Sequence, residues 1–165
     1  MKNKWIILLI SLLVTQFSFG QIPSQKLNID TTITGFHFAA NYSGTFIYTP
    51  NGKSDLKTTN PSAFSFTIMP NATFAHALEQ IDLLVNMSKQ DGYIQTNIVK
   101  KDTTINGYKA YYISFTEILI GTDYKNMVFD AFYIKDNTAL LFVSGDLNNG
   151  KYIESFKKTF YTTKL

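Results

Sequence analysis

Few side chains in this chain of 165 residues are of the kinds that usually carry out chemistry. There are two histidines, His37 and His76, and there is neither cysteine nor arginine. His76 stands three residues before Glu79, a spacing that places two side chains on one helix face and lets both bind one metal ion. A metal site needs further ligands, and no acidic cluster or histidine pair accompanies these two. We therefore expect no metal site and no cofactor, since both residues also fit a polar helix surface.

Nucleophilic chemistry has no clear signature either. A serine nucleophile usually stands in a Gly-x-Ser-x-Gly turn. The nearest match is Ser144 followed by Gly145, which fits a strand that ends in a turn. His37 lies between two phenylalanines and is most simply a strand residue. No glycine-rich phosphate loop is present, so the sequence predicts no catalytic residue of these classes.

Paired carboxylates, as used in glycoside hydrolysis, are the remaining catalytic pattern. Glu117, Asp123 and Asp130 lie in or beside expected strands. Strand alternation places Asp130 on the same face as Phe132 and Ile134. The chain has 12 acidic residues scattered along its length, however, and chance accounts for such a grouping. No acidic residue is therefore assigned a catalytic role.

Two other groups of residues favour binding. On a helix, His76, Leu83 and Met87 fall within about 40° of one another on an otherwise polar face. Tyr111 and Tyr112 belong to a run of aromatic residues in the central strands, where tyrosines could stack on a sugar or line an apolar pocket. Scattered exposed apolar residues are common, and packing beneath helices also accounts for the tyrosines. These five residues are the candidate ligand- or partner-binding residues.

The elements that must position these residues follow from periodicity. A helix is expected to begin after Asn71 or Thr73 as N-cap and to end near Gln90, before Asp91-Gly92. A second helix is expected over 147–161. Strands are expected over 45–49, 63–69, 93–101, 108–117, 124–135 and 139–144, with a weaker one around 33–40.

This order predicts an α+β fold. The last four strands form an antiparallel meander, and two helices can cover the two faces of the sheet. We expect an antiparallel sheet of about six strands covered by two helices, an α/β/α sandwich. Residues 45–165 would form this single domain, after a partly irregular segment over 21–44.

At this level of pattern the chain resembles the PsbP-like superfamily over residues 45–163. The resemblance rests on the strand that ends in Met69-Pro70, the helix from Thr73, the hairpin over 105–112 and the terminal helix at 152–156. It implies a PsbP-like fold and, because many relatives are auxiliary subunits or adaptors, a role without catalysis. The superfamily offers no common catalytic residues to carry over.

The beginning of the chain predicts export. Lys2 and Lys4 precede an apolar run over 5–19, and small residues occupy the −3 and −1 places before a boundary at Gly20-Gln21. This is the pattern of a cleavable signal peptide over 1–20. A spanning helix would need about 20 apolar residues, so we expect no stable membrane span after cleavage.

Charge and composition limit the classes of molecule that the protein is expected to bind. The signal segment carries two lysines and no acidic residue, so its removal takes the formal net charge from +3 to +1. A near-neutral surface gives no reason to expect nucleic acid as a partner. The leading hypothesis is an exported, non-catalytic binding or adaptor domain of the bacterial envelope, periplasmic or extracellular. It would bind another envelope protein or a small apolar or sugar ligand, in an oligomeric state that the sequence leaves open. A small envelope hydrolase that uses strand carboxylates or His76 is the alternative.

Overall fold

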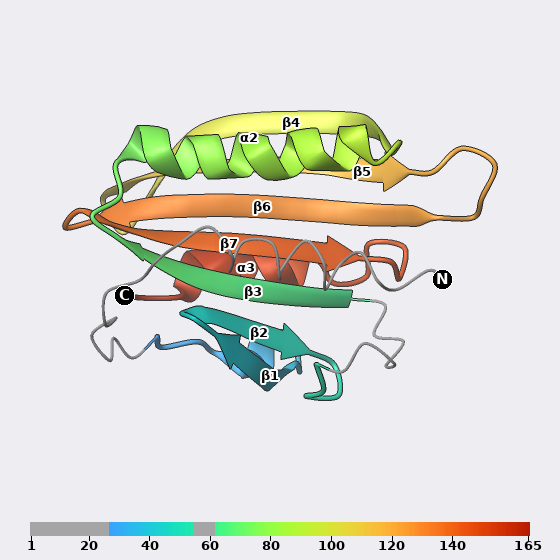
Figure 1. Cartoon of the computed structure of the whole chain (residues 1–165). Coiled ribbons are helices and arrows are strands. Elements are labelled where there is room, and N and C mark those ends of the chain that lie inside the picture. The colour runs from blue at the N-terminus through green and yellow to red at the C-terminus, as the bar shows by residue number, and fades with distance from the viewer. Residues whose placement is uncertain (1–26, 55–61) are drawn as a thin grey trace.

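The computed structural model describes residues 27–54 and 62–165. The expected signal peptide, its cleavage site and the start of the segment over 21–44 lie outside these ranges. In chain order the elements are η1 (Thr31–Ile33), β1 (His37–Tyr42), β2 (Thr45–Thr49), β3 (Ser62–Pro70), α2 (Phe74–Gln90), β4 (Ile94–Ile105), β5 (Tyr108–Ile118), β6 (Lys125–Lys135), β7 (Thr138–Asp146) and α3 (Ile153–Thr162) (Figure 1). Within the described ranges, no helix is long and apolar enough to cross a bilayer.

The seven strands found within residues 27–54 and 62–165 form one antiparallel sheet in the order β1-β2-β3-β7-β6-β5-β4. The meander expected from the sequence is confirmed, since β4 to β7 are neighbours in sequence and in space. The expected count of about six strands is wrong, because β1 makes a seventh. This edge strand is poorly buried, with Phe38 54% and Tyr42 47% exposed, and its pairing with β2 is irregular. Its sequence therefore lacks the alternation that marks a half-buried strand.

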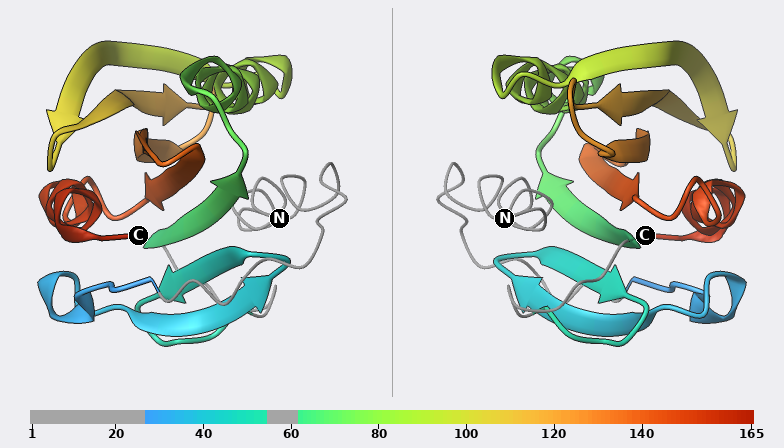
Figure 2. Two further views of the ribbon diagram at one scale, coloured as in Figure 1. Left: turned by 90° about the vertical axis from the view of Figure 1, so that its left-hand side faces the viewer. Right: turned by 90° about the vertical axis from the view of Figure 1, so that its right-hand side faces the viewer.

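The two helices cover opposite faces of the sheet, so the expected α+β arrangement is confirmed (Figure 2). Two residues of β6 show that the sheet has a core on each face. Phe129 packs in the cluster beneath α3, and Phe132 packs in the cluster beneath α2. The α3 cluster is dominated by aromatic rings, among them Phe64, Phe66, Phe142, Phe156 and Phe160. The α2 cluster is mostly aliphatic and includes Ile81, Leu84, Val85, Ile113 and Leu141.

Helix α2 begins and ends where its sequence predicts. Thr73 is the N-cap, and its side-chain oxygen accepts a hydrogen bond from the backbone N–H of His76 at 3.2 Å. The helix ends at Gln90, and Gly92 follows with a φ of 87° that favours glycine. The residues buried against the sheet are Ala77, Ile81, Leu84, Val85 and Ser88. Ser88 is the only polar residue of that set, so it places a hydroxyl group on the core face.

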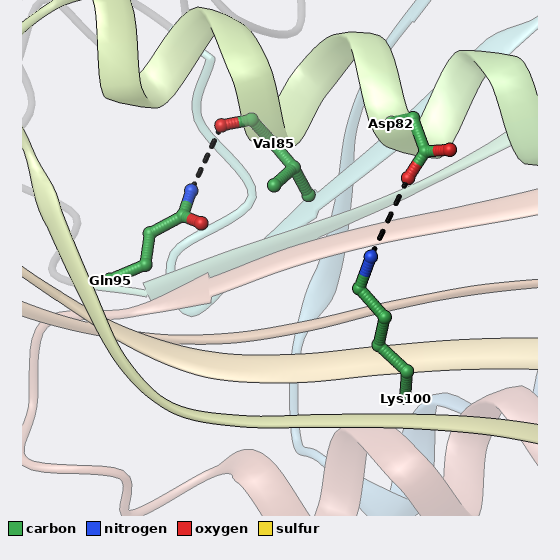
Figure 3. A network of polar contacts seen from close by, with 4 residues as sticks. All are labelled: Asp82, Val85, Gln95 and Lys100. Atoms are coloured by element: carbon green, nitrogen blue, oxygen red, sulfur yellow. Dashed lines mark hydrogen bonds and ion pairs between the residues drawn. The ribbon is translucent and has the colours of Figure 1, made fainter.

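Edge strand β4 is joined to α2 by two polar contacts (Figure 3). The amide nitrogen of Gln95 donates to the backbone oxygen of Val85 at 2.9 Å. Lys100 forms an ion pair with Asp82 at 3.9 Å, and because both side chains are about half exposed the pair contributes little stability. The amide contact is partly buried and joins the C-terminal half of α2 to β4.

The closing helix starts later than expected. Residues 147–152 form a turn ahead of α3, because Asn149 and Gly150 have positive φ angles of 55° and 78° that a helix does not accommodate. A Cβ at position 150 would also clash with the sulfur of Met127. Glycine is thus required there by both backbone conformation and space.

Candidate functional site

The outer stripe of α2, defined as His76, Leu83 and Met87, lies where the sequence placed it. His76 is exposed, Leu83 is 42% exposed and Met87 is partly buried. All three lie on the helix face away from the core residues. The stripe is therefore accessible, and its role in partner binding stays a prediction.

Tyr111 and Tyr112 are not brought together. Tyr111 is 7% exposed and packs beneath α2 with its ring 5.8 Å from that of Phe132. Tyr112 faces the α3 side, partly buried, with its ring 5.5 Å from that of Phe129. They contribute to the two separate cores, and their predicted role in ligand binding is not tested by this arrangement.

The structure instead assembles a row of polar side chains beneath α2. Glu117 of β5 pairs across the sheet with Gln95 of β4 on one side and with Asn126 of β6 on the other. Glu117 is 7% exposed. Its carboxylate accepts a hydrogen bond from the Ser88 hydroxyl at 2.5 Å and another from the Asn126 amide nitrogen at 3.0 Å. Burial raises the pKa of Glu117, against the lowering effect of these two donors.

Asp130 of β6 is a second buried acid, and it lies on the same face of the sheet as Glu117. It is 3% exposed, and its Oδ1 accepts one hydrogen bond, from the backbone N–H of Ser144 at 3.0 Å. Burial raises the pKa of Asp130 to about 8, and the charge of Glu117 acts in the same direction. The carboxyl group therefore holds its proton at neutral pH, where an ordinary aspartate has lost it.

Asp130 lies at a break in the hydrogen-bond ladder between β6 and β7. The ladder pairs Val128 with Gly145 and resumes at Ala131 with Phe142, so the pairs between them are skipped. There the N–H of Ser144 donates to the side chain of Asp130 and not to a backbone oxygen of β6. Its hydroxyl group donates to the backbone oxygen of Phe129 at 2.6 Å. An acidic side chain has thus replaced a backbone acceptor in the middle of the sheet.

A cavity of about 50 Å³ lies against both acids. Asn126 and Asp130 are four residues apart on β6. The Asn126 amide lies against Gly145, and the Asp130 carboxyl group binds the N–H of the adjacent Ser144. Two small residues, Ala63 and Gly145, pair on β3 and β7 in the cavity wall. The lining consists of Ala63, Leu84, Phe115, Glu117, Asn126, Val128, Asp130, Val143, Ser144 and Gly145.

Three buried polar atoms in or beside this region have no hydrogen-bond partner. They are Oδ1 of Asn126, Oε1 of Gln95 and the hydroxyl oxygen of Ser65. Asn126 lines the cavity, Gln95 is next to Glu117, and Ser65 lies opposite Val143 on the cavity wall. An unpaired buried acceptor costs free energy, and such atoms are rare in folded proteins. Hydrogen-bonding capacity around the cavity is therefore not fully used within the protein.

The similarity of this chain to known proteins is one of fold alone. No protein-family model and no curated protein matches the chain. The solution structure of the cyanobacterial PsbP protein, CyanoP, from Synechocystis superposes with a TM-score of 0.50, at 15% identity, over 91% of this chain and 98% of that one. The fold is PsbP-like. A Pseudomonas aeruginosa protein of unknown function, suggested to be a regulator, has a TM-score of 0.47 at 12% identity, over 86% of each chain.

Within this PsbP-like fold the catalytic patterns considered from the sequence remain apart. His37 and His76 are both exposed, and neither lines the cavity. The Ser144 hydroxyl donates to a backbone oxygen and has no histidine beside it. Among residues 27–54 and 62–165 there is no group of three side chains that could hold a metal ion. The chemistry that the site offers is proton storage at Asp130 and hydrogen-bond acceptance at Asn126 and Glu117.

The sequence contains part of the signal for this cavity. Asp130 interrupts an apolar run, and its expected face with Phe132 and Ile134 is confirmed, since both pack in the α2 cluster that adjoins the cavity. The contribution of Asn126 could not be found in this way. Its meeting with Glu117 depends on the register of β5 and β6, which local patterns do not determine.

Proposed function

We propose that the protein is an exported, non-catalytic domain of the bacterial envelope that binds a small ligand in the acidic cavity beneath α2. The observation that carries this proposal is the unpaired Oδ1 of Asn126 on the cavity wall. A fully buried amide oxygen without a donor is unfavourable in the empty protein, and a ligand that donates a hydrogen bond would remove this cost. Export rests on the signal-peptide pattern over residues 1–20.

The alternative, a small envelope hydrolase, has less support from the geometry. A glycosidase needs two carboxyl groups on either side of a sugar ring. Cavities that hold ligands of that size are usually about 300 Å³ or larger, whereas this cavity is about 50 Å³. Asp130 and Glu117 therefore have space beside them for a few atoms only. His76, on the outer stripe, lies on the far side of α2.

Partner binding remains a second candidate function because Leu83 is 42% exposed on the outer stripe. An exposed leucine on a polar helix face can mark a protein contact. Leu83 points about 100° away from its neighbour Leu84, which lines the cavity. Single substitutions can therefore test the two roles separately.

Native mass spectrometry of the protein purified gently from its own cells tests the ligand proposal. We expect a stoichiometric small-molecule adduct on the wild type and its loss from Ala63→Leu, which fills the cavity. Such overpacking costs about 1–3 kcal/mol, so the variant should still fold. Glu154→Gln is the control, because its side chain is 84% exposed and lies on α3.

The proposal fails if the wild type shows no adduct and a chemically diverse fragment set raises the unfolding temperature of the wild type and Ala63→Leu equally. A co-purifying protein that survives Ala63→Leu but is lost from Leu83→Asp would instead favour the adaptor role of the outer stripe.

A further inference from the structure

A second cavity, of about 320 Å³, lies beside the C-terminal residues of the chain. Cavities of about 300 Å³ or more are of the size that usually holds small-molecule ligands. Tyr108 and Tyr133 line it and pack in the α3 cluster, so the sheet separates it from the cavity beneath α2. We call it the C-terminal cavity. Its lining consists of Asn106, Tyr108, Tyr133, Lys135, Lys164 and Leu165.

Hydrogen bonds hold one wall of the C-terminal cavity in place. Tyr133 is 2% exposed, and its hydroxyl group donates to the backbone oxygen of Thr163 at 3.4 Å and accepts from the N–H of Leu165 at 3.0 Å. The backbone oxygen of Lys164 accepts from the N–H of Asn28 at 3.4 Å. The last residues thus lie against β6, at the end of the sheet where β6 turns into β7 (Figure 1). Their backbone is held on both sides, whereas Lys164 itself is exposed to solvent.

The side chains that line the C-terminal cavity are positively charged or neutral. Lys135 and Lys164 contribute two ammonium groups, and the lining contains no aspartate or glutamate. Burial raises the pKa of Tyr133, so its hydroxyl group stays neutral. The ion pairs formed within residues 27–54 and 62–165 involve other lysines. Neither lysine of the cavity therefore has a carboxylate side chain as its partner in that part of the chain.

Other acidic groups near the C-terminal cavity do not balance both lysines. Lys135 donates a hydrogen bond to the main-chain oxygen of Leu165 at 2.9 Å. A terminal carboxylate at Leu165 would offset one of the two charges. Asp136 follows Lys135 in the exposed turn to β7, but it does not line the cavity, and among the described residues it forms no ion pair. The cavity therefore keeps at least one unbalanced positive charge, at Lys164.

The remaining side chains of the lining supply an aromatic surface and a further hydrogen-bond donor. The Tyr108 ring is partly buried, with the Lys135 ammonium nitrogen 5.9 Å from its centroid. Asn106 is exposed in the turn between β4 and β5, and its amide group can donate. Ammonium and amide groups bind the oxygens of an acid group, and a tyrosine ring packs against an aromatic or apolar group.

We propose that the C-terminal cavity binds a small organic anion, with its acid group at Lys164 and Lys135 and its apolar part against Tyr108. A volume of about 320 Å³ accommodates about ten non-hydrogen atoms, at roughly 30 Å³ for each atom of the size of a water molecule. A carboxylate and a phosphate monoester both provide the acid group that two lysines bind. This site goes beyond the proposed function and does not depend on it.

NMR titration of the isotope-labelled wild type with sodium benzoate tests the inference. We expect saturable shifts in the backbone amide signals of the lining residues Asn106, Tyr108, Lys135 and Leu165. The signal of Lys125, at the opposite end of β6, should hardly change. Benzamide has the same ring without the negative charge and should bind at least about tenfold more weakly. Phenyl phosphate carries a phosphate on that ring, so its affinity relative to benzoate shows which acid group the site prefers.

Lysine variants locate the acid group of the ligand. Lys164→Gln should lower benzoate affinity at least about fivefold, and Lys164→Arg, which keeps the charge, should restore most of it. Lys164 is exposed, so both variants should fold like the wild type. Lys125→Gln makes the same change of charge at an exposed position on β6 outside the cavity, and it should bind benzoate as the wild type does.

The inference is overturned if benzamide binds as well as benzoate, if Lys125→Gln lowers affinity as much as Lys164→Gln, or if sodium chloride alone causes the same shifts. Ala63→Leu, which fills the cavity beneath α2, should leave benzoate binding unchanged. Loss of benzoate binding from Ala63→Leu would place the anion beneath α2 and overturn the inference. An adduct that depends on Ala63, in a protein that binds neither benzoate nor phenyl phosphate, would leave the proposed function standing and remove the second site.

Discussion

Two buried aspartates on neighbouring strands satisfy their oxygens in different ways. Asp146, at the end of β7, accepts hydrogen bonds from the Ser62 hydroxyl at 2.6 Å and from the backbone N–H groups of Asn148 at 2.8 Å and Tyr152 at 2.7 Å. Asp130, in the middle of β6, accepts one, from Ser144. Both side chains are nearly inaccessible, at 0% and 3% exposed.

The position of each residue in its strand explains the difference. Asp146 is followed by a turn whose backbone N–H groups are free to bind it, and it connects the start of β3 to the first turn of α3. Its oxygens need no ligand. Asp130 lies where neighbouring N–H groups are committed to the sheet, and the break at Ser144 provides a single donor. A buried acid with three donors is structural, whereas a buried acid with one donor beside a cavity has capacity left to bind.

The same substitution at both positions should separate these roles, and its largest effect falls at Asp146. Asp146→Asn replaces an acceptor with an amide that opposes a backbone N–H group. We expect a loss of about 3 kcal/mol in the free energy of unfolding, because hydrogen bonds to charged groups contribute about 1.5–3 kcal/mol each. Asp130→Asn should cost less than about 1 kcal/mol at pH 6, because its side chain is already neutral there. Urea unfolding measures both, and equal losses would remove the distinction between the two aspartates.

The pH dependence of stability should come from Asp130 and Glu117. Burial raises the pKa of Asp130 to about 8 and also raises the pKa of Glu117. The folded protein thus retains protons that the unfolded chain releases above pH 4. Stability should therefore fall as pH rises from 5 to 8, by at most about 1.4 kcal/mol per pH unit for each group.

Urea unfolding at pH 5, 6.5 and 8 measures this slope. Asp130→Asn should flatten it, leaving the part that Glu117 contributes, and Glu154→Gln should leave it unchanged. A wild type whose stability rises over this range would show that Asp130 is ionised in the folded state.

A smaller effect is expected where α2 contacts the acidic end of the cavity. Ser88→Ala removes the hydroxyl group that donates to Glu117. We expect a loss of about 1–2 kcal/mol in the free energy of unfolding, because the hydroxyl donates to a buried carboxyl group. A titration of the Glu117 carboxyl carbon by NMR should show a higher pKa in the variant, since a donor to the charged form has been lost. An unchanged pKa would mean that the hydroxyl does not bind Glu117 in solution.

Local patterns were sufficient to predict the elements that position the site. The alternation over 63–69 and the capped, amphipathic helix after Thr73 both appear as expected, because each depends on neighbouring residues only. The register of β5 with β6 depends on the whole sheet, and it brings Glu117 to Asn126. The signal for edge strand β1 in the sequence is weak. Apolar and polar residues alternate where one face of a strand is buried, and β1 is poorly buried.

The candidate site was predictable only in part. An aspartate within an apolar strand indicates that Asp130 faces the core, but the break in the ladder at Ser144 has no sequence signature. The cavity wall includes Ala63 and Gly145, which pair on two strands that are distant in sequence, and local patterns do not determine such a pairing. The sequence led instead to the outer stripe of α2, because exposed apolar residues on a polar helix face are visible in a helical projection.

The smallest expected effect on stability tests that outer stripe against the cavity side of the same helix. Leu83 is 42% exposed and Leu84 is 4% exposed. Leu83→Asp should change the free energy of unfolding by no more than about 0.5 kcal/mol. Leu84→Asp should unfold the protein or nearly so, because it places an unpaired charge against the cavity wall. Thermal unfolding of the two variants gives the comparison. If Leu83→Asp retains stability and the small-molecule adduct but loses a co-purifying protein, α2 contributes to two binding functions. A strongly destabilised Leu83→Asp would place the outer stripe in the core.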